Sequence, residues 1–119
     1  MSQRQQRVAD LIHQQLAELL KKEVRDSRLS KISLTAVSIS PDLKQAKVFY
    51  FLLENQNEKE VQKALNKATG YLRHLLAQAT VLRYVPKLEF VYDESIERAH
   101  RISFLIERAL KKDDSDESS

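Results

Sequence analysis

The sequence predicts an α+β fold in which helices pack against a three-stranded sheet. Three observations support this prediction. Apolar residues recur every three to four positions in three long segments, which is the pattern of an amphipathic helix. Shorter segments between them are rich in β-branched and aromatic residues, as strands are. The 119 residues, 42% hydrophobic and 31% charged, indicate one domain over residues 1–110 and a tail at 111–119.

The first predicted element is an amphipathic helix of about six turns, followed by a loop. Charged and polar residues lie opposite its apolar stripe, so we expect one side to face a core. The segment from Asp26 to Ser30 breaks the helical period and is expected to form the loop. The apolar stripe consists of Val8, Leu11, Ile12, Leu16, Leu19, Leu20 and Val24.

Two strands are predicted next, joined by a tight turn. The alternation begins at Ile32, but its phase slips at Val37, which predicts a β-bulge or a twist within the strand. Pro41-Asp42 suits a turn, because proline fits the first central position. The run 46–53 is β-rich and apolar on both faces, so we expect an antiparallel hairpin covered at least partly on each side.

A second helical stripe runs from Val61 to Leu82 and crosses the single glycine of the chain. Asn57 followed by Glu60 fits the start of this helix. Glycine inside a helix costs about 1 kcal/mol relative to alanine. We therefore expect a kink at Ala68-Thr69-Gly70, giving two helices on one continuous stripe.

A third strand and a last helix complete the order. Val85-Pro86 ends the preceding helix, because the residue before proline disfavours helical geometry. Alternation over 87–92 predicts the strand, and Asp93 or Ser95 can cap the helix that follows.

The last helix and the tail have separate expected roles. Phe49 and Phe51 point to the face of the sheet opposite Val48 and Tyr50, so we expect the last helix to cover part of that second face. The tail, 111–119, is acidic and is predicted to be disordered.

Composition excludes several classes of function. Because the chain has no cysteine, disulfides, thiolate nucleophiles and cysteine zinc sites are excluded. One glycine rules out Walker loops, dinucleotide fingerprints and the two-glycine GxxG loop. His13, His74 and His100 belong to no ligand cluster or nucleophile–base spacing, so we predict no enzyme, no metal and no cofactor.

The composition also indicates the charge of the domain and the compartment of the protein. The net charge is +3, and residues 111–119 hold four carboxylates against two lysines, so the body is more basic than the whole chain. A basic body indicates a polyanionic partner. No apolar run approaches the about 20 residues of a membrane span, and no signal core is present, so we expect a cytoplasmic protein without membrane contact.

Four stretches, spread in order over about residues 4–110, resemble the ribosome-binding factor A family. The order helix–strand–strand–helix–kink–helix–strand plus a C-terminal helix is similar to the type II KH-like fold. Ala68-Thr69-Gly70 is the most diagnostic stretch, since an Ala-x-Gly kink replaces GxxG in this family. Ser27 departs from the family, in which proline is common there, and should loosen the loop. The first stretch is Arg7-Val8 together with residues 23–29, the second is residues 40–43 together with 46–48, and the third is residues 68–73. The fourth consists of Leu82-Arg83, Pro86-Lys87-Leu88, Phe90, residues 92–95 and Arg101-Ile102.

The resemblance implies a function. Family members bind the free small (30S) ribosomal subunit, contact 16S rRNA, and assist late maturation and 16S rRNA 5′-end processing, including growth in the cold. They perform no chemistry and hold no cofactor. A ribosome-assembly GTPase is a further expected partner, and we expect a monomer.

The candidate RNA contacts are cations near helix ends, the kink and the loop after the first helix. For the loop the alternative is structural, because Asp26 can lock Arg25 or Arg28. For the cations on the helices, the alternative is that they belong to a helix face that contacts only solvent. The strand aromatics are expected in the core, and Tyr71 beside the kink is the aromatic to test first. The candidates are Arg4, Arg7, Arg25, Arg28, Lys31, Lys67, Arg73, His74, Arg83 and Arg101.

A second function remains open on the residues alone. A basic domain also suits a protein-interaction module that binds an acidic protein partner. Release from free subunits by RNase favours the RNA-binding function, because such a module does not depend on intact RNA.

Overall fold

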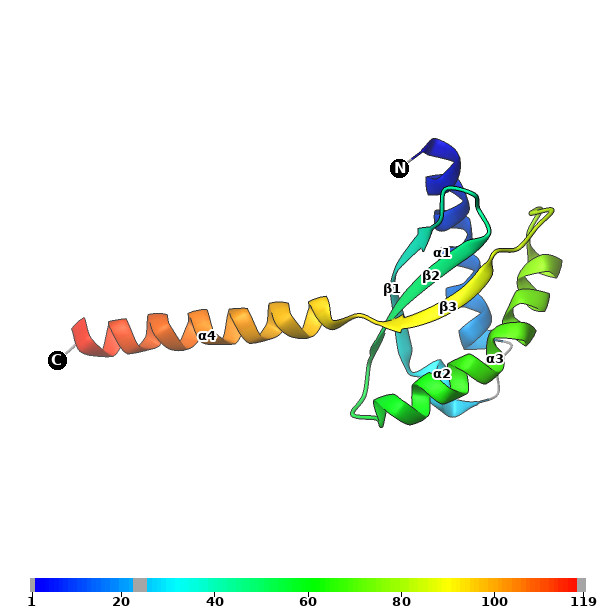
Figure 1. The fold of residues 1–119 in the computed structure, drawn as a ribbon. Helices are drawn as coiled ribbons and strands as arrows, with labels where there is room; N and C mark the ends of the chain where they lie inside the picture. Colours follow the sequence, from blue (N-terminus) through cyan, green and yellow to red (C-terminus); the bar gives the residue numbers. More distant parts are fainter. Residues whose placement is uncertain (1, 23–25, 118–119) are drawn as a thin grey trace.

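The computed structural model describes residues 2–22 and 26–117 (Figure 1). Side chains of Ser27 and of 111–117 lie outside the description. The elements are α1 (Gln3–Lys22), α2 (Ser27–Ser30), β1 (Ile32–Ile39), β2 (Gln45–Leu52), α3 (Glu58–Ala79), β3 (Lys87–Tyr92) and α4 (Glu94–Glu117).

The sheet has the order β1-β2-β3 and is mixed. β1 and β2 form the expected antiparallel hairpin, whereas β3 pairs parallel with β2, because α3 carries the chain back along the sheet. The register shifts between Leu34 and Ala36, so the bulge predicted from the phase slip is confirmed. The α+β fold and the three-stranded sheet are as predicted.

The core lies between one face of the sheet and the helices α1 and α3. Ile12, Leu16, Leu72 and Val48 are fully buried there. Burying such a side chain stabilises the fold by about 1.5–3 kcal/mol. Tyr50 is buried as well, which raises the pKa of its phenol to about 12. The expectation that the strand aromatics lie in the core is therefore confirmed for Tyr50 and Phe90, and Tyr92 packs against the core. It is wrong for Phe49 and Phe51, which are half-buried on the opposite face of the sheet.

A glutamine ties α3 to two strands. The hydroxyl of Tyr50 donates to Oε1 of Gln62 at 2.6 Å, and Nε2 of Gln62 donates to the carbonyl of Phe90 at 2.9 Å. These bonds satisfy polar atoms beside the core, where unpaired groups are costly. They hold the first half of α3 against β2 and β3.

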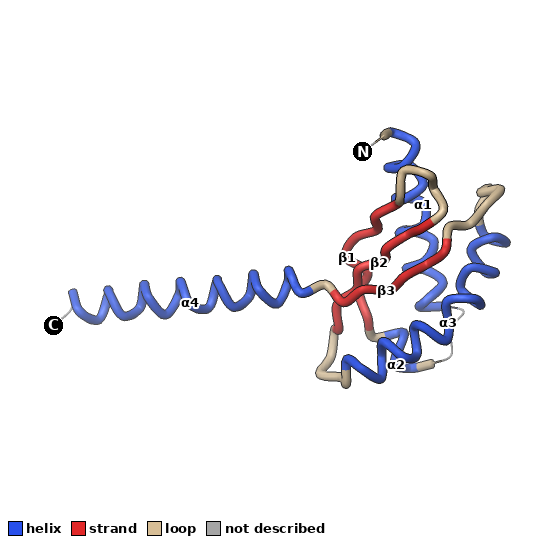
Figure 2. Tube along the Cα trace, viewed as in Figure 1, coloured by secondary structure: helices blue, strands red, loops and turns tan. Residues whose placement is uncertain are grey.

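Within the part of the chain that the structure describes, no helix covers the other face of the sheet (Figure 1), so the expectation that the last helix covers it is wrong. Figures 1 and 2 show α4 projecting away from the domain as a single long helix. The physical reason is the connection: β3 ends at Tyr92 and α4 begins at Glu94, which leaves no loop in which the chain can reverse. The carboxylate of Asp93 also accepts hydrogen bonds from Ser95 and from Thr35 of β1, so it anchors the start of α4.

The predicted kink in α3 is present as a bend (Figures 1 and 2), although residues 58–79 form one continuous helix and not two. Its axis changes direction part-way along (Figures 1 and 2). The hydroxyl of Thr69 donates to the carbonyl of Asn66 at 2.9 Å, and such bonds bend helices. A Cβ added at Gly70 would meet nothing within 4 Å, so packing inside the protein does not require glycine there.

Helix α4 reaches Glu117, within the segment predicted to be a disordered tail. The boundary between a domain at 1–110 and a tail at 111–119 stays a prediction. None of the helices in the described part of the chain combines the length and apolar character needed to cross a membrane.

Candidate nucleic-acid interface

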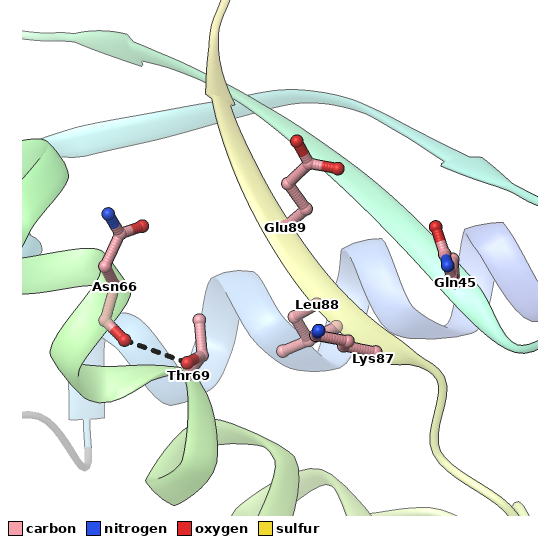
Figure 3. Close-up of a pocket in the computed structure, with 6 residues that line it drawn as sticks. All are labelled: Gln45, Asn66, Thr69, Lys87, Leu88 and Glu89. Carbon is pink, nitrogen blue, oxygen red and sulfur yellow. Dashed lines mark hydrogen bonds between the residues drawn. The ribbon is translucent and has the colours of Figure 1, made fainter.

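A groove runs between the bend of α3 and the edge strand β3 (Figure 3). It has a volume of about 310 Å³. β3 forms the edge because it pairs only with β2 in the order of the sheet. The groove is lined by Gln45, Asn66, Thr69, Lys87, Leu88 and Glu89.

The groove offers hydrogen-bonding groups of several kinds. Amides come from Gln45 and Asn66, a hydroxyl from Thr69, an ammonium from Lys87 and a carboxylate from Glu89. Amides and hydroxyls suit base edges and sugar, and an ammonium suits phosphate. The arrangement is suited to binding.

The predicted contacts on α3 divide into exposed and committed side chains. Lys67 and His74 are exposed near the bend. Arg73 is half-buried, and its Nη2 donates to the carbonyl of Val85 at 2.9 Å. Its guanidinium therefore fixes α3 to the segment before β3, while its Nε is buried without a hydrogen-bond partner.

At α2, Asp26 holds Arg28, which is the structural alternative to an RNA contact for this segment. Nε and Nη2 of Arg28 donate to the two carboxylate oxygens of Asp26 at 3.1 and 2.8 Å. The hydrogen bonds from Arg28 hold the pKa of Asp26 below its usual value, and those to Asp26 raise the pKa of Arg28. Lys31 pairs with Glu54 at 3.0 Å. Arg25 lies outside the described residues.

The remaining candidates lie apart from these. Arg4 and Arg83 line one cavity at the end of the domain opposite α2 (Figure 1). Arg7 is exposed on α1, and Arg101 is exposed on the projecting α4. The predicted cations therefore form several separate groups.

Sequence reasoning missed most of the polar residues that line the groove and the cavity. Gln45 and Lys87 are neighbours through the pairing of β2 with β3, and Asn66 joins them through the packing of α3 on the sheet. Lys44 and Tyr84 join Arg4 and Arg83 in the cavity. The adjacent Arg83-Tyr84 was the available signal, because a basic–aromatic pair in a loop is typical of single-strand recognition.

The one-sided helical layer, the mixed sheet and the bent α3 define a type II KH-like binding module. The chain belongs to the ribosome-binding factor A family, whose sequence model matches residues 4–106. It is a ribosome maturation factor and not an enzyme.

Relatives and solved structures agree with this assignment. Ribosome-binding factor A of Coxiella burnetii strain CbuG_Q212 is 99% identical over 119 residues, covering 100% of both chains. That of Nitrosococcus oceani is 43% identical, covering 97% of this chain and 91% of the relative. The crystal structure of the factor from Thermus thermophilus has a TM-score of 0.66 at 26% identity, covering 74% of this chain and 94% of that chain.

A further structure concerns a complex. A homology model of the Thermus thermophilus factor, fitted into a cryo-EM map of a 30S complex with that factor, has a TM-score of 0.62 at 27% identity. It covers 72% of this chain and 91% of that chain.

Proposed function

We propose that this protein binds the immature small (30S) ribosomal subunit, contacts 16S rRNA, and assists late maturation and 5′-end processing, including in the cold. The observation that carries the proposal is the family match over residues 4–106, a family in which a Thermus thermophilus member is seen in a 30S complex. In this proposal the protein is a cytoplasmic monomer without a cofactor, and a ribosome-assembly GTPase is a further partner.

The groove beside the bend of α3 is the proposed RNA contact. Gly70 supports this, because it is exposed and a Cβ there would point into open space. Because packing within the protein does not require a glycine here, the missing side chain leaves room for the backbone of an external molecule to approach closely. Lys87 lines the groove, and the exposed Lys67 directly follows the lining residue Asn66 on α3, so both ammonium groups can attract phosphate.

Sedimentation of a tagged protein with free small subunits tests the function. The wild type should co-sediment with free subunits from cold-shocked cells, and RNase should release it. Retention after RNase, through an acidic protein, would favour the alternative of a protein-interaction module. Absence from the subunit fraction would overturn the proposal.

A pair of valine variants tests the site. Gly70→Val places a side chain on the bare surface, whereas Ala77→Val adds similar bulk to an exposed position elsewhere on α3. We expect Gly70→Val to weaken subunit binding at matched melting temperature and Ala77→Val to leave it unchanged. Equal binding by both variants would remove the groove from the proposal.

A further inference from the structure

A cavity of about 530 Å³ lies at the end of the domain that carries the start of α1 and the β1–β2 turn. Three segments build it: the first turn of α1, the turn at residues 42–44, and the connection between α3 and β3. Its volume lies in the about 300–1,000 Å³ range of small-molecule sites. Its lining combines the polar and aromatic side chains of Arg4, Asp42, Lys44, Arg83 and Tyr84 with an apolar floor that includes Leu82.

The turn at one wall is held rigidly. Oδ1 of Asp42 accepts from the hydroxyl of Ser40 at 2.6 Å and from the backbone N–H of Lys44 at 3.0 Å. Leu43 has a φ of 62°, a left-handed conformation that costs a residue other than glycine about 1 kcal/mol or more. The carbonyl of Lys44 accepts from the N–H of Lys87 at 2.8 Å. Lys44 is thereby placed at the cavity by a fixed backbone.

The cations of the cavity are free, unlike those at the opposite end of the domain. Arg4, Lys44 and Arg83 form no ion pair with any described residue, whereas Arg28 and Lys31 at the α2 end are both paired. The carboxylate of Asp42 is the one acidic group of the lining. The Ser40 hydroxyl and the Lys44 N–H keep its pKa low, so it stays charged and leaves Oδ2 to accept a further hydrogen bond.

An exposed aromatic ring stands beside these cations. Tyr84 is 62% exposed although it is a large apolar ring, and no described ring packs on it. Aromatic rings next to cations bind single-stranded nucleic acid, since bases stack on the ring while the cations neutralise phosphate. A peptide of acidic residues alone would use the cations but would leave the ring and the apolar floor without a matching group.

We infer that this cavity holds one unpaired nucleotide of ribosomal RNA, as a second contact separate from the groove at the bend of α3. The base stacks on Tyr84 above the apolar floor, and Arg4, Lys44 and Arg83 face its phosphates. Oδ2 of Asp42 is placed to accept from an exocyclic amino group. The inference rests on the proposed ribosomal function, for which it names a further point of contact.

Binding of short single-stranded oligoadenylate to the full chain tests this. We expect Tyr84→Ala to weaken binding about tenfold and Tyr84→Phe, which keeps the stacking surface, to retain it. Val81→Ala is the matched control, because Val81 is 96% exposed in the same connection but does not line the cavity. Arg83→Gln should weaken binding and reduce its salt dependence by about one counterion.

Several results would overturn the inference. They are no saturable oligoadenylate binding, equal binding by Tyr84→Ala and the Val81→Ala control, equal affinity for a blunt RNA duplex, or tighter binding of polyglutamate. Subunit co-sedimentation separates the two proposals. If the wild type co-sediments with subunits and Tyr84→Ala behaves like the wild type in both assays, only the proposal for the cavity is overturned. If the wild type itself does not co-sediment, the proposed ribosomal function is overturned.

Discussion

Helices α3 and α4 have 22 and 24 residues and the same amphipathic period, yet of the two only α3 is packed. Leu65 and Leu72 on α3 are fully buried, while Ile102 and Leu105 on α4 are 58% and 61% exposed. α3 has a connection on each side in which the chain turns back onto the sheet, whereas a single residue separates α4 from β3. An apolar stripe therefore predicts a helix and its apolar face, but the connections decide whether anything in the same chain covers that face.

The largest expected effect comes from truncating one leucine on each helix. Leu72→Ala should lower the free energy of unfolding by about 2–5 kcal/mol, because it opens a cavity in the core. Leu105→Ala should change it by no more than about 0.5 kcal/mol, since the side chain is mostly exposed. Urea denaturation measures both. Similar losses for the two variants would mean that α4 is packed against the domain in solution.

Arg73 provides a test of the polar attachment of α3. Arg73→Met should cost about 1–3 kcal/mol of stability, because the carbonyl of Val85 loses its donor. Lys67→Met on the exposed side of the same helix should cost no more than about 0.5 kcal/mol. Thermal melting measures the difference. Unchanged melting with a loss of subunit binding would make Arg73 an RNA contact instead.

Helix propensity separates the two helices in a different way. Gly70→Ala should stabilise the protein by about 1 kcal/mol, since the added Cβ meets open space in a helix whose packing is coupled to the fold. Ala99→Gly in α4 should reduce helical circular dichroism and leave the unfolding midpoint unchanged. A midpoint that falls with Ala99→Gly would contradict the independence of α4.

The smallest expected effect is the pH dependence of the start of α4. Hydrogen bonds from the Ser95 side chain, then Thr35, then the Ser95 backbone lower the pKa of Asp93 from its ordinary 3.8. The stabilisation is therefore fully present above that ordinary value and is lost as pH falls through the lower, folded pKa. NMR titration of the carboxyl group, with Asp93→Asn as the control, measures it. A pKa at or above 3.8 would contradict the anchoring of α4 by this residue.

Local signals predicted the strands and the long helices, but the segment from Asp26 to Ser30 that was predicted to be a loop contains the short helix α2, which Asp26 caps. The phase slip before Val37 located the bulge, and Asn57 caps α3 by accepting from the N–H groups of Lys59 and Glu60. The bend of α3 was expected from Gly70, and the structure adds a hydrogen bond from the Thr69 hydroxyl to the Asn66 carbonyl at the same place. Side-chain bonds of this kind depend on rotamers, which residue spacing does not reveal.

The candidate site was predicted less completely. The basic character of the domain was evident, but Arg28 turned out to be paired with Asp26, and Arg73 is bonded to Val85. Conversely, Lys44 and Tyr84 lie far apart in the sequence and meet in one cavity. Whether a cation is free or committed depends on neighbours from other elements, so composition alone does not decide it.

By itself the sequence determined the strands and the long helices, the apolar face of each of these helices, the absence of cysteine chemistry and the resemblance to a ribosome-binding family. These follow from residue type and short-range spacing, which act within a few positions of the chain. Only the tertiary structure decided the parallel pairing of β3 with β2, the projection of α4, and the cations that converge on one cavity. Those features depend on where the connections place distant segments, because long-range contacts form only after the chain has turned back on itself.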